Sequence, residues 1–195
     1  MDKDLQKTLD FITLIDKEKN ITRQTRLTGH GRFENDAEHA WHMAIMAWLL
    51  KDYANEDIDI AKTMMMCLIH DICEIEAGDT YAYDEEGKKT QSAREEQAAQ
   101  HIFGSLPEEK GQELLGLFHE FEERSTPEAR FARVMDNLQP FLLNTSNDGG
   151  DWAEHGVHAS QVRGRQERNS EGSKILADFI DKGIDEQIHK GHLPE

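Results

Sequence analysis

Apolar residues recur every three or four positions along most of the chain. Leu5, Leu9 and Ile12 follow this spacing and predict a first helix over about residues 3–18. The same period predicts six further helices, over about residues 37–53, 58–75, 91–105, 108–124, 126–143 and 172–189. Because the apolar spacing is helical and not alternating, the pattern predicts an all-α fold.

Capping residues mark where several of these helices begin. Asn35 precedes the second predicted helix, and Glu38 follows three residues later, as in a capping box. Pro107 stands at the start of one later helix, and Thr126-Pro127 at the start of another. These signals support the helix boundaries that the apolar spacing indicates.

Polar residues and glycines interrupt the helical spacing in two segments, and we predict that both are loops. The first is 19–35, and the second, 144–151, is the clearest loop of the chain. An irregular stretch follows the second loop and continues to the last helix. The chain shows no internal repeat and no better domain boundary than this loop. At 195 residues it is long enough to bury one core, so we expect a single domain over residues 1–195.

The composition excludes some classes of partner. The formal net charge is −17, which excludes a broad basic surface for nucleic acid but leaves room for a small anion where basic side chains converge. Cys67 and Cys73 fit a reduced protein, and the first residues run into an amphipathic stretch and not a signal peptide. No apolar run approaches the ~20 residues of a membrane span. We therefore expect a cytoplasmic protein without membrane or nucleic-acid partners.

Two imidazoles and two carboxylates form a candidate site for a divalent metal. His70 and Asp71 close the apolar run of the third predicted helix, with His39 upstream and Asp136 downstream. Zn, Co, Mn and Fe accept mixed nitrogen and oxygen ligands, whereas Ca and Mg prefer oxygen alone. A metal held by four protein groups, with open coordination positions, lowers the pKa of a bound water, which suits hydrolysis.

Other candidate residues lie close to these in the sequence. Glu74 is four residues after His70, on the same face of the predicted helix, where a carboxylate suits a general base or acid. Asp79, just past the end of that helix, is a second carboxylate for the rim of the site. His42, three residues after His39, is either an alternative ligand or a hydrogen-bonding partner of one.

Taken together, these residues resemble the H…HD…D signature of the HD-domain metal-dependent phosphohydrolases. The resemblance extends over roughly residues 20–145, to the branch that includes the bacterial 5'-deoxynucleotidases. The stretches that carry it are Glu34-Asn35-Asp36-Ala37-Glu38-His39, His70-Asp71-Ile72-Cys73-Glu74 with Gly78-Asp79-Thr80, and Met135-Asp136-Asn137-Leu138-Gln139-Pro140.

The resemblance implies a compact helical bundle, usually a homodimer, with one divalent metal ion (Co, Mn, Zn, Fe or Ni). Glu74 would position or deprotonate the attacking water, and Asp79 would assist near the sugar or the leaving oxygen. The ligands that the resemblance implies are His39, His70, Asp71 and Asp136. The implied reaction is attack of metal-activated water on a phosphomonoester.

In the nucleotidases, a loop arginine holds the phosphate. Arg23 fits that place, with Arg26 as the alternative, because a guanidinium pairs with phosphate through two hydrogen bonds. Gln24 and Thr80 complete the substrate-binding candidates. In a deoxynucleotidase of this branch a tryptophan follows the arginine and helps to exclude a 2'-hydroxyl, whereas here Gln24 follows Arg23. We therefore expect nucleoside or deoxynucleoside 5'-monophosphates as substrates.

Other interpretations of the same residues remain open. The site could hydrolyse another small phosphoester, or the chain could be a non-catalytic sensor dimer that binds a metal or a nucleotide. A purely structural bundle with a satisfied polar core is a third alternative. Glu74 discriminates between enzyme and sensor, because a binding module needs no general base.

Overall fold

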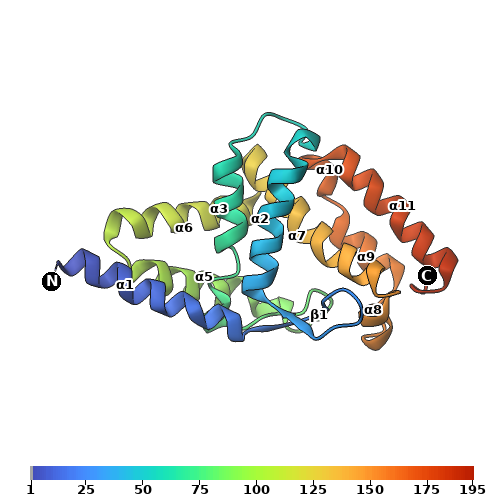
Figure 1. Cartoon of the computed structure of the whole chain (residues 1–195), viewed down its shortest axis with the longest axis horizontal. Helices are drawn as coiled ribbons and strands as arrows, with labels where there is room; N and C mark the ends of the chain where they lie inside the picture. Colours follow the sequence, from blue (N-terminus) through green and yellow to red (C-terminus); the bar gives the residue numbers. More distant parts are fainter. Residues whose placement is uncertain (1) are drawn as a thin grey trace.

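Helices surround one central helix, α7 (Pro127–Ser146), in the computed structural model, which describes residues 2–195 (Figure 1). The elements before α7 are α1 (Lys3–Ile15), η1 (Asp16–Asn20), β1 (Thr22–Arg26), β2 (Phe33–Asn35), α2 (Asp36–Leu50), η2 (Lys51–Tyr53), α3 (Ile60–Ile69), α4 (Glu74–Ala77), α5 (Lys88–Gly104) and α6 (Glu108–Glu123). The elements after it are α8 (Gly150–Glu154), α9 (Ala159–Gln166), α10 (Asn169–Gly172) and α11 (Lys174–Lys190). The predicted all-α class is confirmed.

The predicted loop 19–35 is wrong, because much of it is a short antiparallel hairpin. Strands β1 and β2 pair with Thr22 opposite Asn35 and Arg26 opposite Phe33, and the register is irregular between these pairs. Strands of this length with mostly polar residues give no apolar alternation, so the sequence pattern could not indicate them. The hairpin leads directly into α2 and brings Arg23 to the start of that helix.

The third predicted helix is broken at the residues of greatest interest. α3 ends at Ile69, and α4 begins only at Glu74. Between them the chain forms tight turns, in which hydrogen bonds join residues three apart. The amide of Ile72 donates to the carbonyl of Ile69, and the amide of Glu74 donates to the carbonyl of Asp71. The apolar spacing continues through the break, which is why the sequence predicted one helix over 58–75. The relation between His70 and Glu74 is therefore set by a turn and not by a shared helix face.

The predicted loop 144–151 and the irregular stretch after it are also wrong. α7 continues to Ser146, and α8 begins at Gly150, so only a tight turn separates them. Gly149 in this turn has φ +70°, and a Cβ there would lie 2.4 Å from the backbone oxygen of His192. The stretch that follows contains α8, α9 and α10, which are too short to give a helical period.

The predicted helix caps are confirmed. Asn35 Oδ1 accepts a hydrogen bond from the Glu38 amide at 3.0 Å, and Glu38 Oε2 accepts one from the Asn35 amide at 3.2 Å. Thr126 Oγ1 accepts from the Ala129 amide at 3.3 Å, with Pro127 at the first position of α7. The capping box fixes the direction in which α2 leaves the hairpin.

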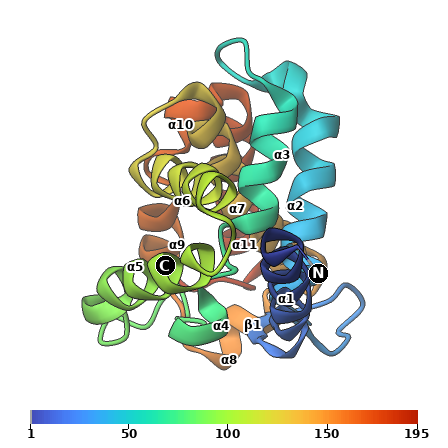
Figure 2. The same ribbon diagram turned by 90° about the vertical axis from the view of Figure 1, so that its left-hand side faces the viewer.

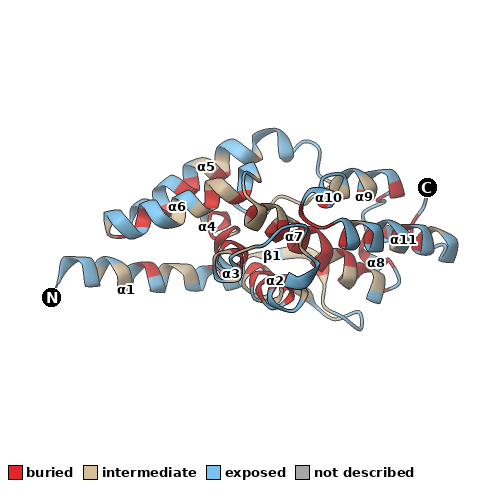
Figure 3. Ribbon diagram, turned by 90° about the horizontal axis from the view of Figure 1, so that it is seen from above, coloured by how far each residue is buried: buried red, intermediate tan, exposed pale blue. Residues whose placement is uncertain are grey.

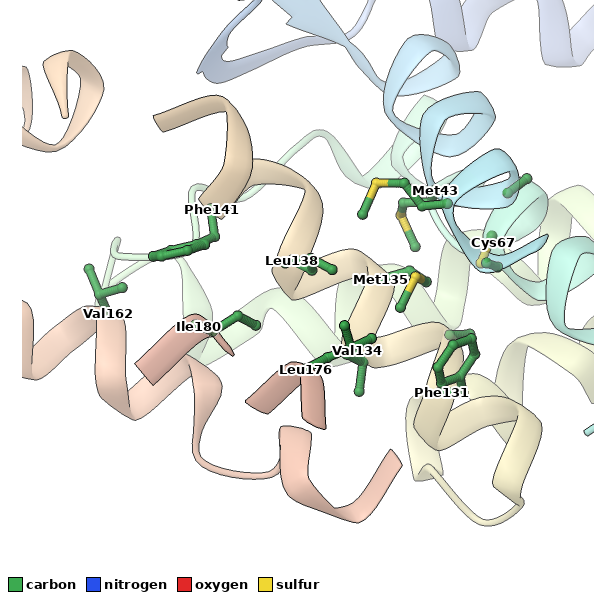
Figure 4. Packing of buried hydrophobic residues seen from close by; sticks show 14 of the residues in the cluster. Met43, Cys67, Phe131, Val134, Met135, Leu138, Phe141, Val162, Leu176 and Ile180 are labelled. Atoms are coloured by element: carbon green, nitrogen blue, oxygen red, sulfur yellow. The ribbon is translucent and has the colours of Figure 1, made fainter. Parts of the chain in front are cut away.

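The main core gathers around α7, which packs against α2, α3, α6, α10 and α11 (Figure 4). Met135, Leu138 and Phe141 on this helix are buried against side chains of its neighbours. A second cluster joins α1, α5 and α6, where the ring of Phe103 lies 6.3 Å from that of Phe11 and 6.2 Å from that of Phe118. Buried positions follow the length of α7, so a polar residue there faces several helices at once (Figure 3).

None of the helices within residues 2–195 combines the length and apolar character that crossing a membrane requires.

Two glycines of α6 should respond in opposite ways to alanine. A Cβ at Gly111 would lie 2.5 Å from the backbone oxygen of Phe103, whereas a Cβ at Gly116 meets nothing within 4 Å. We expect Gly116→Ala to raise the free energy of unfolding by about 1 kcal/mol, because alanine favours helix over glycine. Gly111→Ala should lower it by about 1–3 kcal/mol through overpacking. Urea unfolding followed by circular dichroism measures both, and equal effects would contradict this packing of α6 on α5.

Candidate metal centre

Three of the four predicted ligands meet in the structure. His39 on α2, His70 just after α3 and Asp136 on α7 each offer a ligand atom, and these atoms lie within 4.8 Å of one another. His39 Nε2 is 3.3 Å from Asp136 Oδ1, and His70 Nε2 is 3.9 Å from the same oxygen. All three side chains are buried. Residues that are distant in the sequence therefore form one compact polar cluster.

The two imidazoles are oriented as metal ligands usually are. His70 Nδ1 lies 2.9 Å from the Cys67 carbonyl, and His39 Nδ1 lies 2.9 Å from Gln139 Oε1. Both partners accept hydrogen bonds here, so each Nδ1 donates and each Nε2 is left facing Asp136. Within residues 2–195, the buried His70 Nε2 makes no hydrogen bond, although Asp71 Oδ1 lies 3.1 Å away. An unused ring nitrogen among carboxylates fits a divalent cation, which would bind its deprotonated form.

Gln139 fixes the orientation of His39. Its Nε2 donates to Glu34 Oε1 at 2.6 Å, which leaves Oε1 to face the imidazole. The same Nε2 lies 3.2 Å from His42 Nδ1. Of the two roles considered for His42, the structure therefore favours the hydrogen-bonding one, because this side chain contacts the partner of a ligand and is absent from the cluster itself.

The fourth predicted ligand, Asp71, lies between two groups of side chains. Its Oδ1 is 3.1 Å from His70 Nε2, and its Oδ2 accepts a hydrogen bond from Arg23 Nη1 at 2.8 Å. It also forms a second buried group of carboxylates with Asp36 and Glu74. One oxygen of Asp71 therefore faces the histidine cluster and the other is held by the arginine.

Neighbouring charges give the histidines different proton affinities. Burial lowers the pKa of His39 to about 4, and the nearby charge of Arg23 acts in the same direction. Burial also disfavours a charged His70, but the carboxylates of Asp71 and Asp136 outweigh it and raise its pKa to about 9. A cation at this site would therefore compete with a proton on His70.

The carboxylates around Arg23 also differ in their proton affinity. Burial and the charge of Asp71 raise the pKa of Glu74 well above its usual range. Burial and Asp71 likewise raise the pKa of Asp36 to about 7, although Arg23 Nη1 lies 3.2 Å from its Oδ1. Burial opposes ionisation of Asp71 as well, yet the charges of His70 and Arg23 hold its pKa well below the usual value. Glu74 is thus a buried proton-accepting group beside a fixed anion.

The cluster opens into a cavity with an empty volume of about 970 Å³, including the solvent at its mouth. Gln24, Glu74, Asp79 and Thr80 all line it, as the sequence predicted for a substrate site. Thr80 Oγ1 accepts a hydrogen bond from Arg94 Nη2 at 2.7 Å, which ties the loop after α4 to α5. Most of the residues that line it are polar or charged, so the cavity suits a small polar ligand.

Of the two candidate arginines, the structure places only Arg23 in the cavity wall. The guanidinium of Arg26 pairs with Asp151 and Glu154, and it lies 4.1 Å from the centre of the Phe33 ring. These contacts tie β1 to α8. The geometry therefore favours Arg23 over Arg26 as a phosphate ligand, because Arg26 does not line the cavity and its guanidinium is already paired with two carboxylates.

Two arginines, Arg133 and Arg165, are among the cavity residues that the sequence analysis did not identify. Arg133 Nη1 donates to Asp136 Oδ2 at 3.0 Å, and Arg165 Nη2 lies 3.5 Å from the same oxygen. The spacing of three residues between Arg133 and Asp136 on a predicted helix was an available signal. Arg165 lies on α9, in the stretch predicted to be irregular, so the sequence offered no comparable signal.

Comparison with known proteins agrees with this geometry. The family model of the HD domain matches residues 15–176. A human protein named 5'-deoxynucleotidase HDDC2 is 30% identical over 135 residues, which cover 69% of this chain and 65% of that protein. A Dictyostelium discoideum protein of the same name is 31% identical over 141 residues, covering 69% and 74%. The chain thus spans just under two thirds of the length of the human relative.

Solved structures show the same fold. A predicted metal-dependent phosphohydrolase from Magnetospirillum magnetotacticum superposes with a TM-score of 0.94 at 44% identity, over 98% of this chain and 96% of the other. The protein PH0347 from Pyrococcus horikoshii gives a TM-score of 0.62 at 18% identity, over 92% and 97%, which shows the fold alone. Since the family model covers most of its length, the chain belongs to the HD-domain family.

Proposed function

We propose that this protein is a metal-dependent phosphohydrolase that releases phosphate from nucleoside and deoxynucleoside 5'-monophosphates. The observation that carries the proposal is the cluster of His39, His70 and Asp136, which opens into a cavity also lined by Glu74 and Arg23. The similarity to proteins named 5'-deoxynucleotidase and metal-dependent phosphohydrolase supports it. Single-domain organisation over residues 1–195 is part of the same proposal.

The cofactor we propose is one divalent ion (Co, Mn, Zn, Fe or Ni), with His39, His70, Asp71 and Asp136 as its ligands. Such an ion lowers the pKa of water and offsets the charge of a phosphate. The Nε2 atoms of both histidines face Asp136 Oδ1, and Asp71 Oδ1 lies beside His70. This mixed set of nitrogen and oxygen donors suits a transition metal better than Mg or Ca.

Glu74 is the residue we assign to proton transfer. It is buried next to the anionic Asp71, and burial together with that charge raises its pKa, which makes it a stronger proton acceptor than an exposed carboxylate. Asp79 lines the same cavity, and burial raises its pKa too, so we assign it to the region of the sugar or the leaving oxygen. Arg23, held by Asp71 and Asp36, presents its guanidinium at the wall where we place the phosphate.

Gln24 and Thr80 are the proposed contacts to the rest of the nucleotide. Both line the cavity, and the side chain of Thr80 is fixed by Arg94. An amide at position 24 can hydrogen-bond to a 2'-hydroxyl, whereas the tryptophan of a related deoxynucleotidase obstructs it. We therefore propose that ribose and deoxyribose are both accepted.

We further propose that the protein is a homodimer formed through the α2 face, defined as Trp41, Ile45, Trp48 and Leu49. Trp41 and Leu49 are each 62% exposed and Trp48 is 53% exposed. No Asp, Glu, Lys or Arg occurs between Glu38 and Lys51, so α2 is apolar on its outer side as well as its inner side. An exposed face of this kind indicates a protein interface.

A second copy of the chain is the partner that best fits this face. The exposed Met65 and Leu68 of α3 continue it, and α1 lies along the same edge of the molecule (Figure 3). Figure 2 shows α2 and α3 side by side. Two chains of charge −17 repel each other, so they can associate only where both surfaces carry little charge. The α2 face meets this condition, and a two-fold axis through it pairs the face with itself.

The two cysteines support a location in the cytoplasm as part of this proposal. Cys67 and Cys73 are both free and buried. Buried thiols without a disulfide are typical of proteins from a reducing compartment.

Removal of one imidazole should abolish tight metal binding. His70→Gln or His39→Gln replaces a nitrogen ligand by a neutral amide, and we expect the bound metal to fall at least about tenfold. The control is His119→Gln, since His119 is half-buried away from the cluster and pairs with Glu96 at 2.9 Å. Metal content after dialysis against limiting Mn or Co measures the effect. Full retention of metal by both cluster variants would refute the ligand assignment.

Metal-loaded protein should release phosphate from both deoxy- and ribonucleoside 5'-monophosphates. We expect Glu74→Gln to lower kcat by about 10²–10⁴-fold through loss of proton transfer. Glu76→Gln is the matched control on the same helix, because Glu76 contacts His101 at 2.9 Å outside the cavity. If no nucleotide releases phosphate with Co, Mn or Zn, the proposed reaction is wrong. Full activity of Glu74→Gln would show that Glu74 does not carry out the proton transfer assigned to it.

A charge on the α2 face should separate the dimer. We expect Trp48→Glu to sediment as a monomer at concentrations where the wild type is dimeric, because a carboxylate would be buried against its own copy. Phe179→Glu on α11 is the control, since Phe179 is 52% exposed but lies outside the α2 face. Analytical ultracentrifugation gives the masses. A wild type that is monomeric at every concentration would contradict the proposal.

A further inference from the structure

The arginines of the cavity wall differ in how their guanidinium groups are used. Arg23 donates to Asp71 and Asp36. Arg133 donates to Asp136 and Glu122, and it lies 4.2 Å from the centre of an aromatic ring, that of Phe121. The guanidinium groups of both side chains are thus already paired with carboxylates of the protein.

Arg165 is the exception. Within residues 2–195 its guanidinium makes no hydrogen bond, and its nearest acidic atom is Asp136 Oδ2 at 3.5 Å from Nη2. Its Nε is buried and, within the described residues, has no partner, as is also true of the Nε atoms of Arg23 and Arg133, so the difference lies in the Nη groups. A buried donor without a partner costs free energy unless a ligand supplies an acceptor. Among the described residues, the cavity therefore contains one guanidinium group whose N–H donors make no hydrogen bond to the protein, although its charge lies beside Asp136.

Buried amides hold the end of α9 against α7 and so fix the position of Arg165. Asn137, next to Asp136 in sequence, donates through Nδ2 to the Arg165 carbonyl at 3.4 Å and to Asn169 Oδ1 at 2.7 Å. Asn169 Nδ2 in turn donates to Gln166 Oε1 at 2.6 Å. Asn137 and Asn169 are both buried. The backbone of Arg165 is therefore positioned before any ligand arrives.

Arg23 and Arg165 approach the same cluster through different carboxylates. Arg23 is bound to Asp71, whose other oxygen is 3.1 Å from His70 Nε2. Arg165 lies beside Asp136, whose Oδ1 is 3.9 Å from the same nitrogen. An anion that enters the cavity beside His70 is thus within the region that both guanidinium groups border.

We propose that Arg165 binds the phosphate of the substrate through its guanidinium fork, as a second phosphate-binding residue in addition to Arg23. This rests on the proposed phosphohydrolase function and deepens it. Two guanidinium groups and a divalent cation, partly offset by the carboxylates of Asp71 and Asp136, leave an excess of positive charge for the dianion of a phosphomonoester. A phosphodiester carries one negative charge and has fewer free oxygens, so the site should favour monoesters.

A purely structural role for Arg165 makes a different prediction. Arg165 could act only by offsetting the charge of Asp136, whose pKa it helps to hold below the usual range against the effect of burial. Its removal would then weaken metal binding and leave phosphate affinity of the metal-loaded protein unchanged. Phosphate affinity and metal content must therefore be measured on the same samples.

The experiment is calorimetric titration of inorganic phosphate into Mn-loaded protein. We expect Arg165→Gln to weaken phosphate binding about 10–100-fold, the loss typical of a charge-assisted hydrogen bond, with bound Mn unchanged. Arg165→Lys should recover part of the affinity, because it restores the charge without the fork. The control is Arg163→Gln, which removes the same charge from the same helix, since Arg163 pairs with Asp181 and Asp185 on α11. It should bind phosphate as the wild type does.

Steady-state kinetics on a nucleoside 5'-monophosphate provide a second readout, in which KM should rise more than kcat falls. Unchanged phosphate affinity in Arg165→Gln would overturn the inference, as would a loss of bound Mn that alone accounts for the weaker binding. The titration requires no turnover. If wild-type protein hydrolyses no nucleotide, the proposed function fails, whereas the role of Arg165 is still decided by phosphate binding.

Discussion

The structure depends above all on how the buried carboxylate of Asp136 is neutralised. This residue lies on the innermost helix, where an unpaired charge costs several kcal/mol. One of its oxygens faces the Nε2 atoms of His39 and His70, and the other accepts from Arg133. To supply these partners, α2 and the end of α3 must pack directly on α7. The same helix contacts therefore pack the main core and assemble the metal centre.

The site contains many carboxylates, and their proton affinities differ. Asp71 and Asp136 have pKa values held below the usual range by neighbouring cationic groups, although burial opposes this. Those of Asp36 and Glu74 are raised by burial and by Asp71. A strongly acidic protein can in this way concentrate carboxylates around one arginine, Arg23, without a large repulsive charge. As a result, the proton-binding carboxylate of Glu74 lies near Asp71 and Asp136 in the cavity wall, whose pKa values are low. Acid–base catalysis requires such a difference in proton affinity.

The sequence predicted the principal helices and their caps, because apolar period and capping are local properties. The capping box at Asn35 and the proline at the start of α7 are examples. It did not predict the hairpin β1–β2 or the break between α3 and α4. Mostly polar strands give no apolar alternation, and the apolar period continues through the break. In each case contacts with distant segments, and not local preference, decide the backbone.

The kinds of side chain that could form a site, namely imidazoles, carboxylates and arginines, can be read from the order of residues alone. The apolar spacing also indicated that Glu74 and Asp136 belong to helices. Which of these groups meet depends on how the helices pack. The tertiary structure placed Arg23 in the cavity and Arg26 outside it, and it brought Arg165 from an unassigned stretch to within 3.5 Å of Asp136. The physical reason is that donor chemistry belongs to a residue, whereas the distance between residues far apart in the chain is set by helix packing.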